Sequence, residues 1–279
     1  MNRLLEFDHV TCQMHDRLLL DDVTFSIPGG QWVAIVGRNG SGKTTLARHA
    51  NALLVPTQGE VRVNGMSTAD AHLRFDIRRT VGLVFQNPDH QMVGSVVEED
   101  VAFGPENFGL SPAEVRERVA RALLTTGLAG LSRRPAHALS GGQKQRLAIA
   151  GLLALEPACM VLDEPTSMLD PEGREEVMAA LRTLHREHSM AIVMITHAME
   201  EVVQAERVLV MSRGRVAFDG PPADLFGDEV RLAALGLEPP AAVQVAAALR
   251  QQGFFPPAEA LTAEALYHWL QGRKMEVSP

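Results

Sequence analysis

The sequence predicts an α/β protein with a mostly parallel sheet, and three patterns carry this prediction. Residues 32–36 are continuously apolar, which is typical of a strand covered on both faces, and they run directly into a glycine-rich loop. Residues 158–163 and 190–196 show the same buried-strand pattern, and a helical pattern at residues 171–188 separates them. A strand, a helix and a second strand in this order form a unit that pairs its strands in parallel.

An antiparallel portion and several helices are expected around this sheet. Residues 5–11 and 23–27 alternate apolar and polar side chains, which predicts an antiparallel edge. Ser111, with Glu114 three residues later, is a helix N-cap pattern, and Gly127 would end the helix that it opens. The remaining predicted elements are a helix at residues 44–54, strands at 60–65 and 80–85, a hairpin at 208–219, and helices at 228–235, 241–252 and 262–270.

Length and composition bound the organisation of the chain. Its 279 residues, 46% of them hydrophobic, suffice for one large α/β domain with a small appendage. We expect this domain at residues 1–226, a helical portion within it at about residues 87–150, and a helical C-terminal appendage at residues 227–279.

Charge, cysteines and hydropathy argue against several classes of protein. A formal net charge of −8 makes nucleic acid an unexpected partner. Cys12 and Cys159 have no second pair with which to form a zinc site. The longest apolar stretches are about half of the ~20 residues that cross a bilayer, and the charged start of the chain does not resemble a signal peptide. Any membrane association should therefore come through a partner.

A phosphate-binding loop is the first indication of function. Residues 37–44 match the pattern G-x-x-x-x-G-K-[ST] between a predicted buried strand and a predicted helix. Glycines allow backbone N–H groups to point at the β- and γ-phosphates of a nucleotide, and the helix N-terminus adds partial positive charge. Lys43 would neutralise the phosphates, and the Thr44 hydroxyl would bind Mg²⁺. The ATP-binding residues expected here are Gly37, Arg38, Asn39, Gly40, Ser41, Gly42, Lys43, Thr44 and Thr45.

Two carboxylates follow the predicted strand at residues 158–163. Asp163 ends this strand and would hold Mg²⁺ through water, while Glu164 would act as the base that polarises the attacking water. An apolar strand that ends in Asp-Glu often means only that the strand has reached solvent. The phosphate-binding loop is what makes this pair a candidate site.

Ser140, Gly141, Gly142 and Gln143 open another predicted helix and form a second anion-binding N-terminus. One ATP molecule does not need both such sites from one subunit. We therefore expect this segment to contact the γ-phosphate of a nucleotide bound by another subunit. An ordinary serine-capped helix would explain Ser140, but it would not explain two glycines that weaken a helix start.

These segments, in this order, resemble the ABC ATPase family over about residues 4–226. The string at residues 139–146 is similar to the family signature, and Ser140 to Gln143 would then act on ATP in trans. The resemblance implies three further site residues. Gln86 matches the Q-loop glutamine that contacts Mg²⁺, Asp170 ends a D-loop-like segment, and His197 matches the switch histidine near the γ-phosphate. One position departs, because Met14 stands where the family stacks adenine on an aromatic residue.

Within this family the chain is most similar to the ATPases of energy-coupling factor and cobalt or nickel importers, in particular to the first of two ATPase paralogues. Residues 84–91, 97–104 and 166–171 carry this likeness. It implies a head-to-tail pair with a second ATPase subunit, a paralogue rather than an identical chain, with the C-terminal appendage as a possible dimerisation region. It also implies a transmembrane coupling subunit, a membrane substrate-binding subunit for a vitamin or a transition-metal ion, and a place at the cytoplasmic face of the membrane.

Three other classes compete with this interpretation. A soluble ABC protein acting in translation or on chromosomes would carry two cassettes or long coiled-coil insertions, and this sequence has neither. A kinase or GTPase with the same loop would not explain Ser140 or His197. An ATPase of a different importer class shares all of these residues and stays open.

Overall fold

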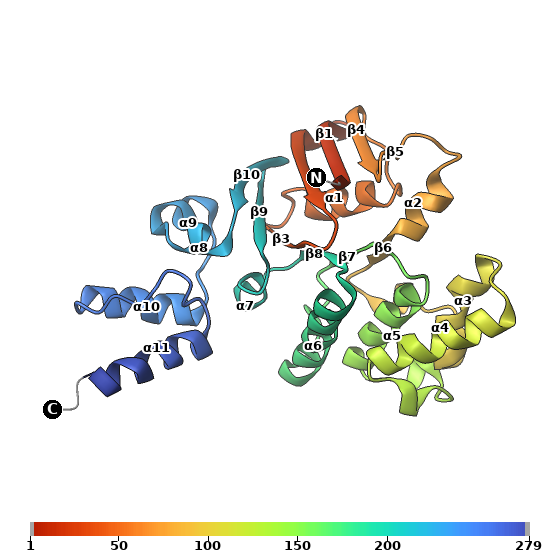
Figure 1. The fold of residues 1–279 in the computed structure, drawn as a ribbon. Coiled ribbons are helices and arrows are strands. Elements are labelled where there is room, and N and C mark those ends of the chain that lie inside the picture. Colours follow the sequence, from red (N-terminus) through yellow and green to blue (C-terminus); the bar gives the residue numbers. More distant parts are fainter. Residues whose placement is uncertain (1–2, 277–279) are drawn as a thin grey trace.

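A parallel sheet with one antiparallel edge strand forms the centre of the computed structural model, which describes residues 3–276 (Figure 1). Its strand order is β10-β9-β3-β8-β7-β6, and only β10 runs antiparallel to its neighbour. This confirms the predicted fold class. The strands are β3 (Trp32–Val36), β6 (Val81–Val84), β7 (Cys159–Asp163), β8 (Ala191–Ile195), β9 (Arg207–Ser212) and β10 (Arg215–Gly220).

The first strands of the chain form a separate antiparallel sheet in the order β2-β1-β4-β5. Its members are β1 (Arg3–Met14), β2 (Arg17–Pro28), β4 (Gln58–Val63) and β5 (Met66–Ser67). The predicted pairing of the first two strands is correct, but they are not the edge of the parallel sheet. Their apolar sides face that sheet across a shared core, and β10 provides its antiparallel edge instead.

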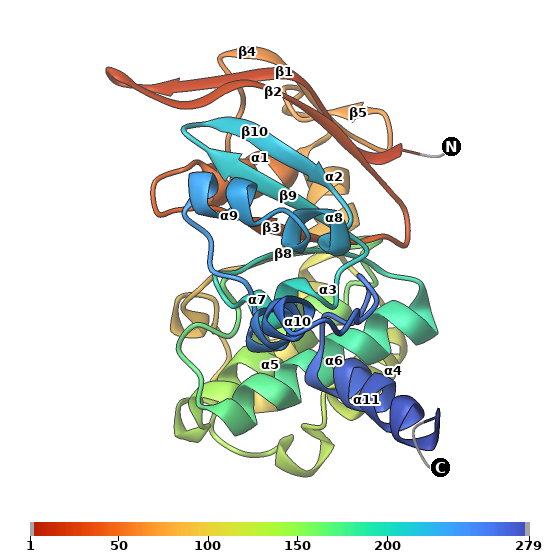
Figure 2. The same cartoon turned by 90° about the vertical axis from the view of Figure 1, so that its left-hand side faces the viewer.

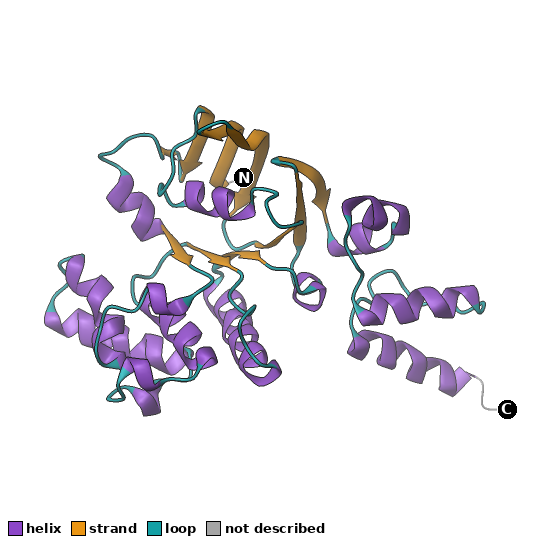
Figure 3. Cartoon of the chain, turned by 180° about the vertical axis from the view of Figure 1, so that it is seen from behind, coloured by secondary structure: helices purple, strands orange, loops and turns teal. Residues whose placement is uncertain are grey.

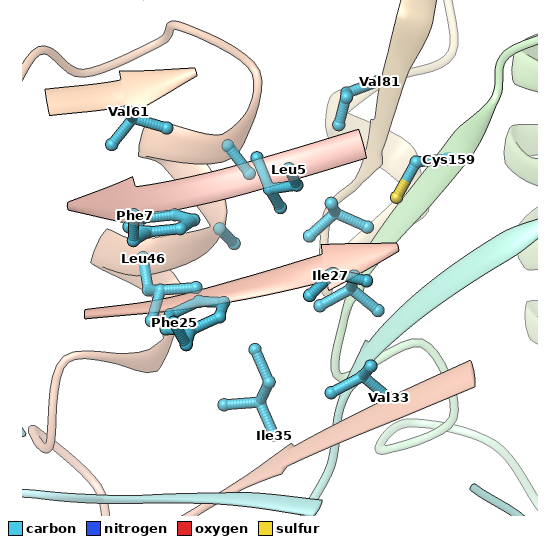
Figure 4. Packing of buried hydrophobic residues seen from close by; sticks show 14 of the residues in the cluster. Leu5, Phe7, Phe25, Ile27, Val33, Ile35, Leu46, Val61, Val81 and Cys159 are labelled. Atoms are coloured by element: carbon cyan, nitrogen blue, oxygen red, sulfur yellow. The ribbon is translucent and has the colours of Figure 1, made fainter. Parts of the chain in front are cut away.

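The core between the two sheets is built from alternate residues of their strands (Figure 4). Phe7 and Phe25 stack with ring centroids 4.6 Å apart, and Leu46 of α1 (Lys43–Ala50) packs in the same cluster. Val33 and Ile35 point into this cluster, whereas Trp32, Ala34 and Val36 point to the opposite face. Strand β3 is therefore buried on both faces, as its continuous apolar sequence predicts.

Helices cover the opposite face of the parallel sheet (Figure 2). The long helix α6 (Pro171–His188) contributes Val177, Leu181 and Leu184, and the C-terminal region adds Leu225, Leu232 and Val243. The helices of this region are α8 (Pro222–Phe226), α9 (Glu229–Leu235), α10 (Ala241–Gln251) and α11 (Ala263–Glu276), while the short helix α7 (Met199–Val202) lies earlier, between β8 and β9. A small cluster of Ala246, Ala260 and Leu266 joins α10 to α11.

A group of helices with its own apolar cluster lies to one side, and the C-terminal helices lie on the other (Figure 3). The group contains α3 (Val97–Asn107), α4 (Pro112–Thr125) and α5 (Gly141–Leu153). Ser111 and Glu114 form the predicted capping box at the start of α4. Helix α2 (Arg74–Thr80) and the 3-10 turns η1 (Pro88–His90), η2 (Ala129–Leu131) and η3 (Ala136–Ala138) complete the described elements.

Two predicted helix ends differ from the structure. The helix expected at residues 44–54 ends at Ala50, because Ala52 adopts a left-handed conformation (φ 56°) and the N–H groups of Leu53 and Leu54 both donate to the Arg48 carbonyl. The last helix extends to Glu276, beyond the expected end at residue 270. Within residues 3–276, no helix combines the length and the apolar character that crossing a bilayer requires.

Candidate functional site

The phosphate-binding loop joins β3 to α1 in a conformation that requires glycine. Gly37 has φ +145°, and a Cβ atom there would lie 2.2 Å from the Met211 carbonyl oxygen. Gly42 has φ +106°, and its Cβ would lie 2.7 Å from the Leu19 carbonyl oxygen. The strands β9 and β2 therefore hold the loop closely from two sides, and both glycines are sterically required.

Lys43 turns back across this loop from the first position of α1. Its Nζ donates to the carbonyl oxygens of Gly37 at 2.7 Å and Arg38 at 3.2 Å, and the residue is only 6% exposed. Burial lowers the pKa of the Lys43 ammonium, and the carboxylates of Glu164 and Asp163 act in the opposite direction. The loop thus presents a buried cation with anionic partners close to it.

Asp163 and Glu164 lie where β7 ends, at the same edge of the sheet as the loop. Asp163 is 7% exposed, and burial raises the pKa of its carboxyl, while the donating Thr44 hydroxyl opposes that shift. Glu164 has φ 52° and donates its N–H to the Ile195 carbonyl of β8 at 2.9 Å. A left-handed backbone conformation is unfavourable for a glutamate, so the surrounding structure must hold it there.

The Glu164 carboxylate is the meeting point of residues from three strand ends. Gln86 follows β6 and donates from Nε2 to Oε2 of Glu164 at 2.9 Å. His197 follows β8, and its Nε2 lies 2.9 Å from Oε1 of Glu164. The structure thus brings together the predicted glutamine, glutamate and histidine, beside the predicted loop.

A cavity of about 710 Å³ opens next to this cluster and has an unexpected wall. One side is formed by Gly37, Arg38 and Asn39 of the loop together with His197. The other side comes from the C-terminal region, between Gly236 and Gln244. Sequence patterns assigned these residues only to an appendage, and gave no indication that they line the candidate site.

Ser140 caps α5 in a reciprocal arrangement with Gln143. The Ser140 hydroxyl accepts from the Gln143 N–H at 3.3 Å, and the Gln143 side-chain oxygen accepts from the Ser140 N–H at 3.1 Å. Gly142 is buried against α6, where a Cβ would lie 3.1 Å from the Gly173 Cα. Close packing of the two helices therefore accounts for Gly142, which an ordinary serine cap does not explain. Gly141 is exposed and has no such neighbour.

The segment at residues 140–143 does not join the cluster around Glu164. In the described part of the chain, no hydrogen bond or ion pair links it to residues 37–45, and α1 and α5 lie apart in Figures 1 and 2. Asp170 also lies outside the cluster, because its side chain caps α6 by accepting from the Gly173 N–H at 2.8 Å. Met14 ends β1 opposite Arg17 and is 43% exposed.

Two features near the site were not predicted from the sequence. Lys144 of α5 forms an ion pair of 2.7 Å with Asp89. This pair connects the helix that begins with the segment at residues 140–143 to the stretch that follows Gln86. Glu201 of α7 is 2% exposed and contacts both Thr166 and Thr196. The printed sequence has two adjacent glutamates here, Glu200 and Glu201, and only the fold decides which one faces inward.

Comparison with known protein families identifies the family of this chain. Residues 20–167 match the model of the ABC transporter family, which is more than half of the chain. The chain therefore belongs to the ABC transporter family.

The relatives of this chain carry a more specific description than the family does. The chain is 55% identical over 250 residues to "Energy-coupling factor transporter ATP-binding protein EcfA1" of Symbiobacterium thermophilum, covering 90% of this chain and 87% of that protein. It is 50% identical over 252 residues to the protein of the same description in Caldanaerobacter subterraneus, covering 90% and 91%.

Solved structures show the same fold. The structure of cbiO1 from Clostridium perfringens, part of the ABC transporter complex cbiONQ, matches with a TM-score of 0.77 and 34% identity, covering 88% of this chain and 99% of that one. A dimeric bacterial ABC transporter cassette matches with a TM-score of 0.70 and 30% identity, covering 78% and 98%.

Substitution of the two signature glycines tests the packing at α5. We expect Gly142→Ala to lower the free energy of unfolding by about 1–3 kcal/mol, because the new methyl group meets the α6 backbone. Gly141→Ala is the matched control, and it should change this free energy by less than ~1 kcal/mol, since a Cβ there would make only an ordinary contact, 3.5 Å from Leu169 Cδ2, and alanine favours helix. Urea unfolding of both variants measures the difference, and equal effects would contradict the packing argument.

Asp163→Asn tests the energetic cost of the buried carboxylate. Burial raises the pKa of Asp163 in the folded protein, so stability is lost as the pH rises through that pKa. In nucleotide-free, EDTA-treated protein at neutral pH we expect Asp163→Asn to raise the Tm, by about 2–4 °C for each kcal/mol recovered. The gain should vanish in acid, where the native carboxyl is neutral. Exposed Asp16→Asn should leave the Tm unchanged, and a lower Tm of Asp163→Asn at neutral pH would refute the argument.

Proposed function

We propose that this chain is the ATP-binding and ATP-hydrolysing subunit of an energy-coupling factor importer for a vitamin or a transition-metal ion. The observation that carries the proposal is the convergence of Gln86, Glu164 and His197 beside the phosphate-binding loop. The family membership and the relatives named above support the same activity.

In this proposal the loop at residues 37–42 and the start of α1 bind the phosphates of ATP. Lys43 supplies a positive charge that already lies within the loop, and Thr45 follows on the same helix. Backbone N–H groups and the helix N-terminus provide further donors. Met14 takes the place of the adenine-stacking aromatic residue, and its exposed thioether can pack against a base face.

The residues beside the loop suit a magnesium ion, which prefers oxygen ligands and retains water. The Thr44 hydroxyl and the buried Asp163 carboxylate lie in hydrogen-bond contact, and the Gln86 amide lies near the same edge. We propose that Thr44 and Gln86 hold the ion directly and Asp163 through water. When bound, the ion neutralises charge on the β- and γ-phosphates.

Hydrolysis then needs a base and a stabilising donor, and the cluster contains both. Glu164 accepts a proton from the water that attacks the γ-phosphorus, as the bond to the leaving oxygen breaks. Lys43 and His197 stabilise the charge that develops on the transferring group. The contacts with Gln86 and His197 hold the Glu164 carboxylate in place.

The second half of the site is proposed to come from another cassette. Ser140 to Gln143 lie apart from this chain's own phosphate-binding loop, and Ser140 and Gly141 are exposed at the helix N-terminus, as a segment that acts in trans requires. Asp170 lies nearby, at the N-cap of the adjacent α6. A head-to-tail pair would then enclose ATP at the interface, and hydrolysis would remove the contacts that hold the pair closed.

The partners follow from the same proposal. The second ATPase subunit is a paralogue rather than an identical chain, and the C-terminal helices near the cavity contribute to pairing. A transmembrane coupling subunit and a membrane substrate-binding subunit complete the assembly, which holds this chain at the cytoplasmic face of the membrane. The −8 charge agrees with the absence of nucleic acid among the partners.

Glu164→Gln tests the catalytic assignment. The amide keeps the shape of the side chain but cannot act as the base, so we expect kcat for ATP hydrolysis to fall by about 10²–10⁴-fold. ATP affinity should change by less than about threefold, since the lost interaction acts in the transition state. Exposed Glu187→Gln at the far end of α6 is the control, and it should hydrolyse ATP normally. Normal hydrolysis by Glu164→Gln would overturn the assignment.

Affinity purification tests the partner assignments. The Glu164→Gln chain, tagged and trapped with ATP in gently solubilised membranes, should recover a different cassette and integral membrane proteins. A second copy of this chain with another tag should not be recovered, and Lys43→Ala, which weakens ATP binding, should recover less of the second cassette. Recovery of the second tag would indicate identical chains, and a soluble complex with ribosomes or DNA would refute the transport role.

A further inference from the structure

Glu201 is a buried carboxylate that the proposed reaction does not use. It lies in the short helix α7 and is 2% exposed, yet both of its oxygens have partners. The Thr166 hydroxyl donates to Oε1, and the Thr196 hydroxyl donates to Oε2. Nε of Arg174 lies 3.7 Å from Oε1. The carboxylate therefore joins three separate segments of the chain.

Each of these segments carries a residue of the candidate site. Thr166 stands two positions after Glu164, and Thr196 immediately precedes His197. Arg174 lies in the first turn of α6, where its N–H donates to the carbonyl of Asp170. One buried side chain thus connects the proposed base, the switch histidine and the D-loop.

Thr196 transmits this connection to the backbone around His197. Its hydroxyl oxygen accepts from the Ala198 N–H at 3.0 Å, while its own N–H donates to the Ile35 carbonyl at 3.2 Å. The backbone is therefore fixed on both sides of His197. The backbone N–H of Glu164 also donates to the Ile195 carbonyl. The two strand ends that carry the proposed base and the histidine are therefore held in one network.

The cost of such an arrangement argues that it serves the site. A buried carboxylate loses hydration that hydrogen bonds and ion pairs only partly return, and apolar residues of similar size often stabilise a fold equally well. Side chains that hold reacting groups within a fraction of an ångström are needed where geometry determines the rate. Both threonine partners of Glu201 lie within two residues of a proposed reacting group, Glu164 or His197.

We propose that Glu201 is a positioning residue for ATP hydrolysis, which holds His197 and Glu164 in their mutual geometry through Thr196 and Thr166. It does not touch the reacting atoms itself. This inference rests on the proposed function, because it assumes that Glu164 and His197 perform the chemistry.

Kinetics of Glu201→Ala and Glu201→Gln in the full chain test this proposal. Glu201→Ala should lower kcat by about ten- to hundredfold, as expected when reacting groups are misplaced. KM for ATP should stay within about threefold, since the phosphate-binding loop is not part of this network. Glu201→Gln keeps the shape and one acceptor oxygen, and its amide can donate to a threonine hydroxyl that turns, so it should retain most of the activity.

Two further variants separate positioning from general loss of stability. Leu184→Ala removes buried atoms from α6 and lowers the Tm without touching the network, so at temperatures well below its Tm its kcat should equal that of the unchanged protein. Thr196→Val keeps the shape of the side chain and removes only the hydroxyl, so its kcat should fall as in Glu201→Ala. It also provides the test if Glu201→Ala does not fold.

The outcomes distinguish this inference from the proposed function. A kcat of Thr196→Val and Glu201→Ala within about twofold of the unchanged protein, with Glu164→Gln inactive, would overturn the role of Glu201 alone. The role of Glu201 would also be overturned if the kcat loss is explained by the lower Tm alone, as judged by comparison with Leu184→Ala. Normal hydrolysis by Glu164→Gln would instead overturn the proposed function. A kcat loss with unchanged KM in both variants, and its recovery in Glu201→Gln, supports the positioning role.

Discussion

The parallel pairing of β7, β8 and β3 is the constraint on which the candidate site depends. In this register Asp163 lies beside Ile195, and Ile195 lies beside Ile35. Parallel strands end at the same edge of their sheet, so the loop after β3, the carboxylates after β7 and the histidine after β8 meet there. The three strands are buried on both faces, so close packing of their side chains against the two apolar layers holds this register.

The site carries an electrostatic cost that the rest of the fold must support. Burial lowers the pKa of Lys43 and raises that of Asp163, so both charged forms are less favourable here than in water. Glu164 adds a left-handed backbone conformation, and Glu201 a buried carboxylate. These features lie together at one edge of a sheet whose core is otherwise apolar. Function and stability therefore make opposing demands at this edge.

Several features could be predicted because local chemistry decides them. The strand at residues 32–36 has the predicted bounds, and Ser111 and Glu114 form the predicted capping box. The loop pattern at residues 37–44 was also recognised from local sequence, whereas Gln86 and His197 were named from the family resemblance and their contact with Glu164 came from the structure. The separate antiparallel sheet could not be predicted, since alternation shows that one face of a strand is buried but not against what. The packing role of Gly142 depends on Gly173 of α6, which lies 31 residues further along the chain and is not revealed by local patterns.

Local sequence determines which chemical groups are available and which strands carry them, because strand burial and loop conformation are set by neighbouring residues. Which of those groups meet depends on the tertiary structure. It joined Gln86 and His197 at Glu164, kept Ser140 apart from them, and brought the C-terminal residues 236–244 to the edge of the cavity. It also turned Glu201 inward rather than Glu200. Contacts between distant segments depend on how whole layers pack, and that packing follows from the fold as a unit rather than from any single stretch of the chain.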